Sequence, residues 1–153
     1  MKIFETSADI VELAQEKFED TGLPQMGVDL KVLSVTKAKS VLKVQRANAA
    51  THFMTKKDIL LTVYEEAFDR LSDEHKNLLM EGVISNISYD TEKDKLNVDT
   101  DFAKEILRMR RKYPNYVDIA EETYLVIDQI EDEERQRKEE ERLAKKEKKN
   151  NKQ

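Results

Sequence analysis

Apolar positions along the first half of the chain change their spacing from segment to segment, and each change predicts a different element. From residue 8 to 20 they recur every three or four positions behind Ser7, which is typical of an amphipathic helix with a capping serine. Residues 28–35 and 40–47 alternate between apolar and polar side chains, which favours two strands joined as a hairpin. Residues 58–64 are almost continuously apolar, so this strand is expected at the centre of a sheet with both faces covered.

The rest of the chain is organised around the stretch from Ser72 to Asp90. Ser72 is a good N-cap, and the wide apolar stripe behind it predicts a helix that lies against the sheet. A loop or irregular segment is expected over residues 48–52, and a small hairpin over residues 88–98. The apolar stripe of the central helix comprises Leu78, Leu79, Val83 and Ile87.

Two further helices complete the pattern. Asp101 caps a helix over residues 102–112, and a last amphipathic helix begins near Val117. Phe102 and Tyr124 fall on the apolar faces of these helices and are expected to point inward. The order of elements predicts an α+β fold, with a sheet of about three strands and a short hairpin packed by helices, followed by a long charged C-terminal helix.

The chain changes character after Ile130. Residues 1–130 are predicted to form a single α+β domain. Residues 131–153 hold nine Lys/Arg and eight Asp/Glu, several of them as i,i+4 pairs in the favourable order. We predict a charged helical extension that frays into a disordered tail by about Lys148.

Composition and charge narrow the classes of function. The chain has 153 residues and no cysteine, so neither disulfides nor thiolate metal sites can form. The first residues lack the pattern of a signal peptide, and no apolar stretch approaches the roughly 20 residues that span a bilayer, so we expect a soluble intracellular protein without membrane contact. The net charge is −5, and residues 1–130 carry eighteen basic and twenty-four acidic side chains. Such an acidic body argues against general binding to duplex nucleic acid.

Histidines and carboxylates offer little site chemistry. His52 and His75 are the only histidines, whereas a zinc site needs three or four ligands, so cap or surface roles are favoured. A relocated hydrolytic site would need both histidines to converge with a further ligand such as Asp90. Glu81, Asp90 and Asp94 could form an acid/base pair only in a cleft with a raised pKa, and a solvated helix edge and turn are favoured instead.

Two groups of basic residues are candidates for partner contacts. One stands at the C-terminal end of the helix over residues 102–112, where cations complement the helix macrodipole or contact an anion or a partner, and it comprises Arg108, Arg110, Arg111 and Lys112. The other could bind nucleic acid through phosphates, although no aromatic residue lies among its members to stack on bases, and it comprises Lys145, Lys146, Lys148 and Lys149.

The order of these features resembles the phage metallopeptidase (zincin-like) domain family from residue 8 to about Gln129. The resemblance is carried by the helix ADIVELAQEKF, the joint ANAATHF before the strand DILLTVYEEAFDRL, and the helix SDEHKNLLMEGVISNISYD, which TEKDKL and DFAKEILRMRRKY follow. In that family the central helix carries His-Glu-x-x-His, whose histidines bind zinc and whose glutamate acts as the base. The resemblance implies a zincin-like fold and a bacteriophage or prophage origin. The expected location of the protein is then the cytoplasm of a bacterial host or a virion.

The motif positions of that family fall on Gly82, Val83 and Asn86. Glycine has no donor atom, asparagine is a poor zinc ligand, and valine cannot accept a proton. We therefore expect no enzymatic activity and no cofactor, but a protein that binds a host factor or a virion component. A nucleic-acid-associated role through the basic tail is the alternative. Gly82 costs about 1 kcal/mol relative to alanine in a helix, so we expect a strand or the last helix to pack closely against it.

Overall fold

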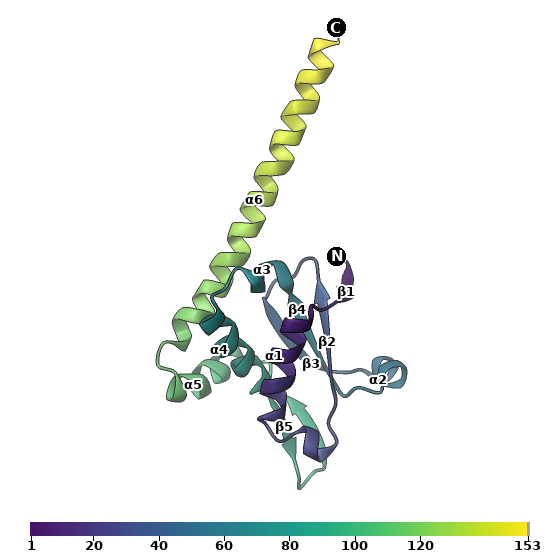
Figure 1. Cartoon of the computed structure of the whole chain (residues 1–153), viewed down its shortest axis with the longest axis vertical. Coiled ribbons are helices and arrows are strands. Elements are labelled where there is room, and N and C mark those ends of the chain that lie inside the picture. Colours follow the sequence, from purple (N-terminus) through teal and green to yellow (C-terminus); the bar gives the residue numbers. More distant parts are fainter. Residues whose placement is uncertain (153) are drawn as a thin grey trace.

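The computed structural model describes residues 1–152, and it confirms the predicted α+β class (Figure 1). The described chain contains a four-stranded sheet, a two-stranded hairpin and six α-helices. The strands are β1 (Ile3–Glu5), β2 (Leu30–Val35), β3 (Leu42–Arg46), β4 (Ile59–Tyr64), β5 (Ile87–Asp90) and β6 (Lys95–Val98). The helices are α1 (Ala8–Glu19), α2 (Ala49–Thr55), α3 (Glu65–Asp69), α4 (Asp73–Ile84), α5 (Phe102–Lys112) and α6 (Tyr116–Asn151), with a 3-10 turn at Pro24–Met26.

The large sheet has the order β1-β2-β4-β3, with β4 in its interior as predicted. β2 runs parallel to β4 and β3 runs antiparallel to it. The predicted hairpin between residues 28–35 and 40–47 is therefore wrong, because β4 lies between these two strands. β4 is the strand whose inward side chains Ile59, Leu61 and Val63 are all completely buried. An interior position covers such a strand on both edges, whereas a β2–β3 hairpin would leave it at an edge.

β1 is a fourth strand that the sequence pattern did not predict. It pairs antiparallel with β2, and Ile3 lies opposite Val35. All three of its residues are exposed, so it lacks the buried alternation by which strands are recognised from sequence. The pairing continues through a hydrogen bond of 2.9 Å from the Ser34 hydroxyl to Thr6 just beyond the strand.

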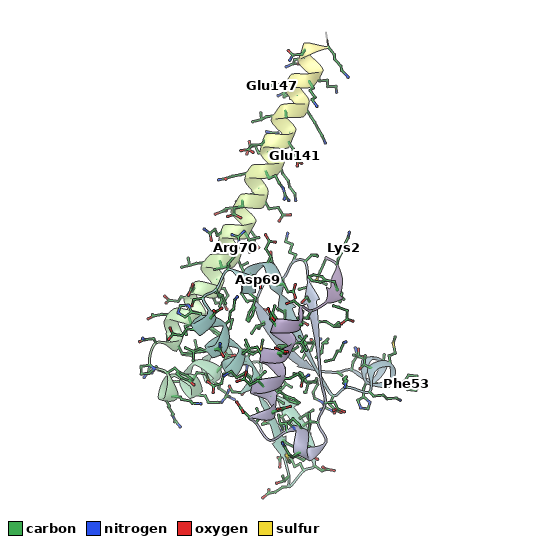
Figure 2. All side chains as sticks on the ribbon, in the orientation of Figure 1. Lys2, Phe53, Asp69, Arg70, Glu141 and Glu147 are labelled. Carbon is green, nitrogen blue, oxygen red and sulfur yellow. The ribbon has the colours of Figure 1, made fainter. Side chains whose placement is uncertain are left out.

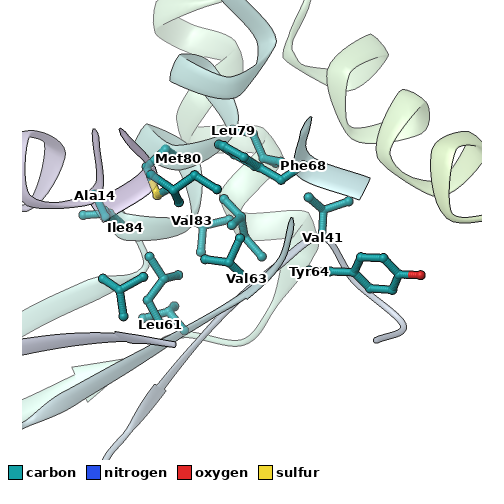
Figure 3. Close-up of a cluster of buried hydrophobic side chains, with 14 of the residues drawn as sticks. Ala14, Val41, Leu61, Val63, Tyr64, Phe68, Leu79, Met80, Val83 and Ile84 are labelled. Carbon is teal, nitrogen blue, oxygen red and sulfur yellow. The ribbon is translucent and has the colours of Figure 1, made fainter. Parts of the chain in front are cut away.

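The main core lies between the sheet and the helices α1 and α4. Met80, Val83 and Ile84 of α4 gather over Leu61 and Val63 of β4 (Figure 3). The helix begins as predicted, because the Ser72 side chain accepts a hydrogen bond from the backbone N–H of His75. Its apolar face contacts α1, which contributes Ile10, Ala14 and Phe18 to the same core.

α2 replaces the loop or irregular segment that was predicted over residues 48–52. Asn48 caps it by accepting a hydrogen bond of 2.8 Å from the backbone N–H of Thr51, and Lys56 ends it in the left-handed conformation. None of its residues is buried. The helix therefore has no apolar periodicity by which it could be recognised from the sequence. The only local signals are the Asn48 cap at its start and the left-handed Lys56 at its end.

The predicted small hairpin and the helix that follows it are both present as β5, β6 and α5. Asp101 caps α5 as expected, with its carboxylate accepting a hydrogen bond from the Ala103 N–H. The prediction that Phe102 and Tyr124 point inward is wrong, because the two side chains are 40% and 53% exposed. Their rings instead meet edge to face at 6.1 Å on the surface. The inward position on this side of α5 is occupied by the carboxylate of Glu105.

α6 is one continuous helix that packs on the body with its first part and leaves it with the second (Figures 1 and 2). The Arg70 guanidinium binds both carboxylate oxygens of Glu133, at 3.1 and 2.7 Å, where α6 passes α3. Beyond that point every described residue is exposed except Glu134, and we call residues 135–152 the arm. The helix continues past Lys148, where the sequence predicted fraying. No described helix combines the length and the apolar character that crossing a bilayer requires.

Candidate functional site

The centre of the candidate site is the contact between Gly82 in α4 and Tyr116 at the start of α6. A Cβ atom on Gly82 would lie 1.9 Å from the Tyr116 hydroxyl oxygen and 2.5 Å from the ring carbon that carries it. Tyr116 itself is completely buried. The predicted close approach to Gly82 is therefore confirmed, and the element that approaches is the last helix.

A buried polar network surrounds this contact. Glu105 of α5 is only 4% exposed, and each of its carboxylate oxygens accepts one hydrogen bond. One comes from the Asn86 amide nitrogen at 2.7 Å, and the other comes from the Tyr116 hydroxyl at 2.8 Å. The Glu105 carboxylate thus joins the end of α4, the first turn of α5 and the start of α6.

Arg108 closes the network towards solvent. Its guanidinium donates to the Asn86 side-chain oxygen at 3.0 Å and to the Ser85 hydroxyl at 2.8 Å. The Ser85 hydroxyl in turn donates to the Gly82 carbonyl. Both ends of the Asn86 amide are consequently engaged within the protein, its nitrogen by Glu105 and its oxygen by Arg108.

Burial raises the pKa of Tyr116, and the adjacent Glu105 carboxylate raises it further by charge repulsion and by accepting the hydroxyl hydrogen bond. The phenol is therefore neutral at every pH at which the protein is ordinarily handled. A neutral donor that is permanently bonded to Glu105 can hold the three helices together, but it cannot act as a base.

Glu81 and Lys112 form a second link between α4 and α5. The Lys112 ammonium lies 2.8 Å from the Glu81 carboxylate. Burial alone would raise the pKa of Glu81, but the hydrogen bond and the charge of Lys112 outweigh it and the pKa is lowered. The same hydrogen bond raises the pKa of Lys112. This carboxylate is therefore an ionised partner of a lysine and not a general acid.

The structure divides the predicted basic group on α5. Arg108 and Lys112 are bonded to α4, so they serve the packing of the body. Arg110 and Arg111 are exposed and make no ion pair among residues 1–152. They are the members of this group that remain available to a partner.

The two histidines lie in different parts of the molecule. His52 of α2 lies 3.3 Å from the Asp58 carboxylate at the start of β4. His75 of α4 lies against Glu122 of α6. The Asp90 carboxylate caps the turn after β5 by accepting the backbone N–H groups of Glu92 and Lys93. These partners do not converge.

The remaining predicted carboxylate, Asp94, stands exposed in the same turn with a positive φ of 48°. It does not join Glu81 or Asp90. Across residues 1–152 no three side chains of His, Cys, Asp or Glu are grouped so that they could hold a metal ion.

Sequence reasoning missed Glu105 and Tyr116 as site residues. Glu105 lies four positions before Met109, on the face of α5 that enters the core, and a carboxylate in line with an apolar stripe is the signal that could have found it. Tyr116 stands in the first turn of the last helix, directly after the stop at Pro114, where the sequence offers no pattern. Its burial follows only from the packing of α6 on α4.

A groove of about 650 Å³ runs beside this network, between strand β3 and the start of α5. Asn86, Glu105 and Phe102 line one side, and Leu60 and Thr62 of the sheet line the other. Three lysines stand around it, namely Lys37, Lys39 and Lys43. Because the Asn86 and Glu105 side chains already have partners, the groove offers apolar surface and positive charge but no obvious reactive pair.

Gly82→Ala should destabilise the protein by about 1–3 kcal/mol, because the new methyl group meets the buried Tyr116 side chain. Helix propensity alone predicts the opposite, a gain of about 1 kcal/mol. Urea denaturation measures the free energy of unfolding. Asn77→Ala, at an exposed position of the same helix, is the control and should change it by less than about 0.5 kcal/mol. A stabilised Gly82→Ala variant would contradict the contact.

Tyr116 should also make stability depend on pH in the alkaline range. Its pKa in the folded protein lies above the usual 10.0, so above about pH 10 the unfolded state loses a proton that the folded state keeps. The stability that this residue contributes is fully present below about pH 10 and is lost as the pH rises further. The difference in free energy of unfolding between the natural protein and Tyr116→Phe should be constant up to about pH 9. It should then shrink by about 1.4 kcal/mol per pH unit above pH 10. A difference in free energy of unfolding that stays constant over the whole pH range would show that folding does not raise the pKa of Tyr116.

The chain matches no protein-family model, and neither the curated proteins nor the solved structures include a match. The resemblance to the phage metallopeptidase (zincin-like) family therefore stays a prediction that rests on the order of sequence features.

Proposed function

We propose that this protein is a non-catalytic interaction protein that binds a protein partner through its C-terminal arm. The proposal is carried by one observation: the place of the family motif is filled by a closed set of contacts. Gly82 is covered by Tyr116, Val83 lies in the core, and Asn86 has both ends of its amide occupied. A zinc ion needs three or four donor atoms, and the one side-chain donor among these three positions, the Asn86 amide oxygen, already accepts a hydrogen bond from Arg108.

The arm supports the second half of the proposal. Its side chains point outward around the whole helix (Figure 2). A helix that buries nothing contributes little to the stability of the body, because helical stability in proteins comes mostly from packing. The arm therefore presents its charges in a defined geometry to something else. On the family resemblance, the partner is a host factor or a virion component, met in the bacterial cytoplasm or in the virion.

A pull-down from a bacterial lysate with the full chain and with a version that ends at Ile130 tests the proposal. We expect a partner that the full chain retains and the shorter chain loses, because the arm carries the contact. Circular dichroism and urea denaturation of the shorter chain verify that residues 1–130 still fold. Arg110→Ala/Arg111→Ala is the matched variant that removes exposed charge from the body and keeps the arm.

Two results would contradict the proposal. One is equal recovery of partners by the two chain lengths. The other is stoichiometric zinc in the purified protein together with a loss of stability on chelation, because a bound metal would restore the case for catalysis.

A second candidate, association with nucleic acid, is supported by a basic stripe on the arm. Arg135, Lys138, Arg142, Lys145 and Lys149 follow one another at intervals of three or four residues, so they lie on one side of the helix. Cations in such a row can contact successive phosphates. The arm has no aromatic residue, so it has no side chain that could stack on bases.

Salt dependence separates this candidate from the first. Nucleic-acid binding by the full chain should weaken steeply with salt, with a slope of log K against log salt of about −0.9 for each phosphate contact. A chain that ends at Arg142 should not bind, because it lacks the last lysines of the stripe. Fluorescence anisotropy with a labelled duplex measures both effects. Absence of binding at low salt would remove the candidate.

A further inference from the structure

Charge along α6 is sorted by sign. The part from Tyr116 to Glu134 carries eight Asp/Glu and no Lys/Arg, whereas the part from Arg142 to Lys152 carries six Lys/Arg and one glutamate. The segment between them, residues 135–141, is balanced with three residues of each sign. The helix is therefore acidic where it lies on the body and basic at the end of the arm.

One side of α6 faces away from the body from Asp128 to the end of the helix. The body-facing side chains are Ile119, Thr123, Val126 and Ile130, which are all buried. Asp128 follows Val126 by two residues, about 200° further round the helix at 100° per residue, so it points in the opposite direction. We call the side that includes Asp128 the outer face of α6.

The outer face continues from Asp128 at intervals of four and three residues through Asp132, Arg135, Glu139, Arg142 and Lys146. All six side chains are exposed. Their charges run from acidic through balanced to basic in the same order as those of the whole helix. Leu125, which is 67% exposed, and Leu143, which is 50% exposed, stand beside this row at its two ends.

This row is complementary to itself when a second copy runs antiparallel. With Asp128 placed opposite Lys146, Asp132 comes opposite Arg142 and Arg135 comes opposite Glu139. Two-fold symmetry makes each of these pairs twice, which is the isologous arrangement of most homodimers. A parallel pair would instead place every charge opposite its own copy. The two helix macrodipoles also oppose each other only in the antiparallel case.

The six paired side chains are exposed, so the body of their own chain does not cover them. The outer face lies on the side of α6 opposite the buried residues, and the arm stands clear of the body (Figure 1). The basic end of one arm can therefore lie along the acidic, body-bound part of the partner helix. The ion pairs along each α6, Asp132–Arg135 and Glu139–Arg142, join exposed side chains and can rearrange at little cost.

We propose that α6 binds the α6 of a second copy of this chain antiparallel along its outer face, with the basic end of each arm on the acidic part of the other. The inference rests on the proposed function, because it takes the arm to be a binding surface, and it names a second copy as one partner. Since the contact consists mainly of exposed charges, the dimer is weak and sensitive to salt.

Sedimentation equilibrium of the full chain tests this at low salt and at about 0.5 M salt. We expect a monomer–dimer equilibrium at low salt that shifts to monomer at high salt. Lys146→Asp should weaken the dimer about tenfold or more, because the new carboxylate faces Asp128 of the other copy, and the two-fold axis makes this repulsive pair twice. Adding Asp128→Lys in the same chain should restore the dimer. Lys148→Asp makes the same change of charge on the opposite side of the helix and should have a much smaller effect.

Cysteine cross-linking determines the orientation, and the natural chain has no cysteine to interfere. A mixture of Asp128→Cys and Lys146→Cys should form the mixed disulfide, whereas Asp128→Cys by itself should not link to its own copy. Lys148→Cys, on the opposite side, should link to neither. Self-linking of Asp128→Cys would show a parallel pair and overturn the proposal, as would a monomer at every salt concentration or a dimer indifferent to Lys146→Asp.

The outcome is independent of the pull-down with the shorter chain. A monomeric protein that still retains a lysate partner through its arm refutes the self-association and leaves the proposed function standing. A salt-sensitive antiparallel dimer that captures no other protein supports the self-association and refutes binding to a different protein.

Discussion

The ring of Tyr116 lies over the one position of α4 that has no side chain, and the rest of the body depends on this contact. A glycine within a helix costs about 1 kcal/mol relative to alanine, so Gly82 is a local weakness of α4. The closeness that it permits brings the Tyr116 hydroxyl to the Glu105 carboxylate, 2.8 Å away. Three helices then meet at one buried acceptor, and the start of α6 is held in place.

The direction of the arm follows from that anchor. α6 starts on α4 and passes α3, where Arg70 binds Glu133, before it leaves the body. Ile130 is the last buried side chain of α6, and the charged side chains beyond it lie outside the core. The body is thereby closed around Gly82, Val83 and Asn86, while the charges of the arm lie on the part of α6 that buries no side chain. The proposal of a binding role rests on this separation.

Local features of the fold were predictable from the sequence, whereas most features that depend on the identity of a distant partner were not. Ser72 and Asp101 cap their helices as expected, because a cap depends on a side chain and a backbone N–H group two or three residues away. The β2–β3 hairpin was wrong, because alternation shows that a segment is a strand but not which strand it pairs with. Of the candidate site, Gly82 was predictable as a close approach. Glu105 was not, because its burial requires the partners Asn86 and Tyr116 from two other elements.

By itself the sequence determined the helices with strong apolar periodicity, the absence of disulfides and the opposite charges of the two ends of α6, since all of these are properties of neighbouring residues or of composition. Only the tertiary structure decided the order of the strands, the division of the basic group on α5 and the burial of Glu105. The physical reason is the same in each case. A buried carboxylate or an interior strand is stable only when distant segments supply its hydrogen bonds and cover its apolar surface, and that supply is a property of the packed chain.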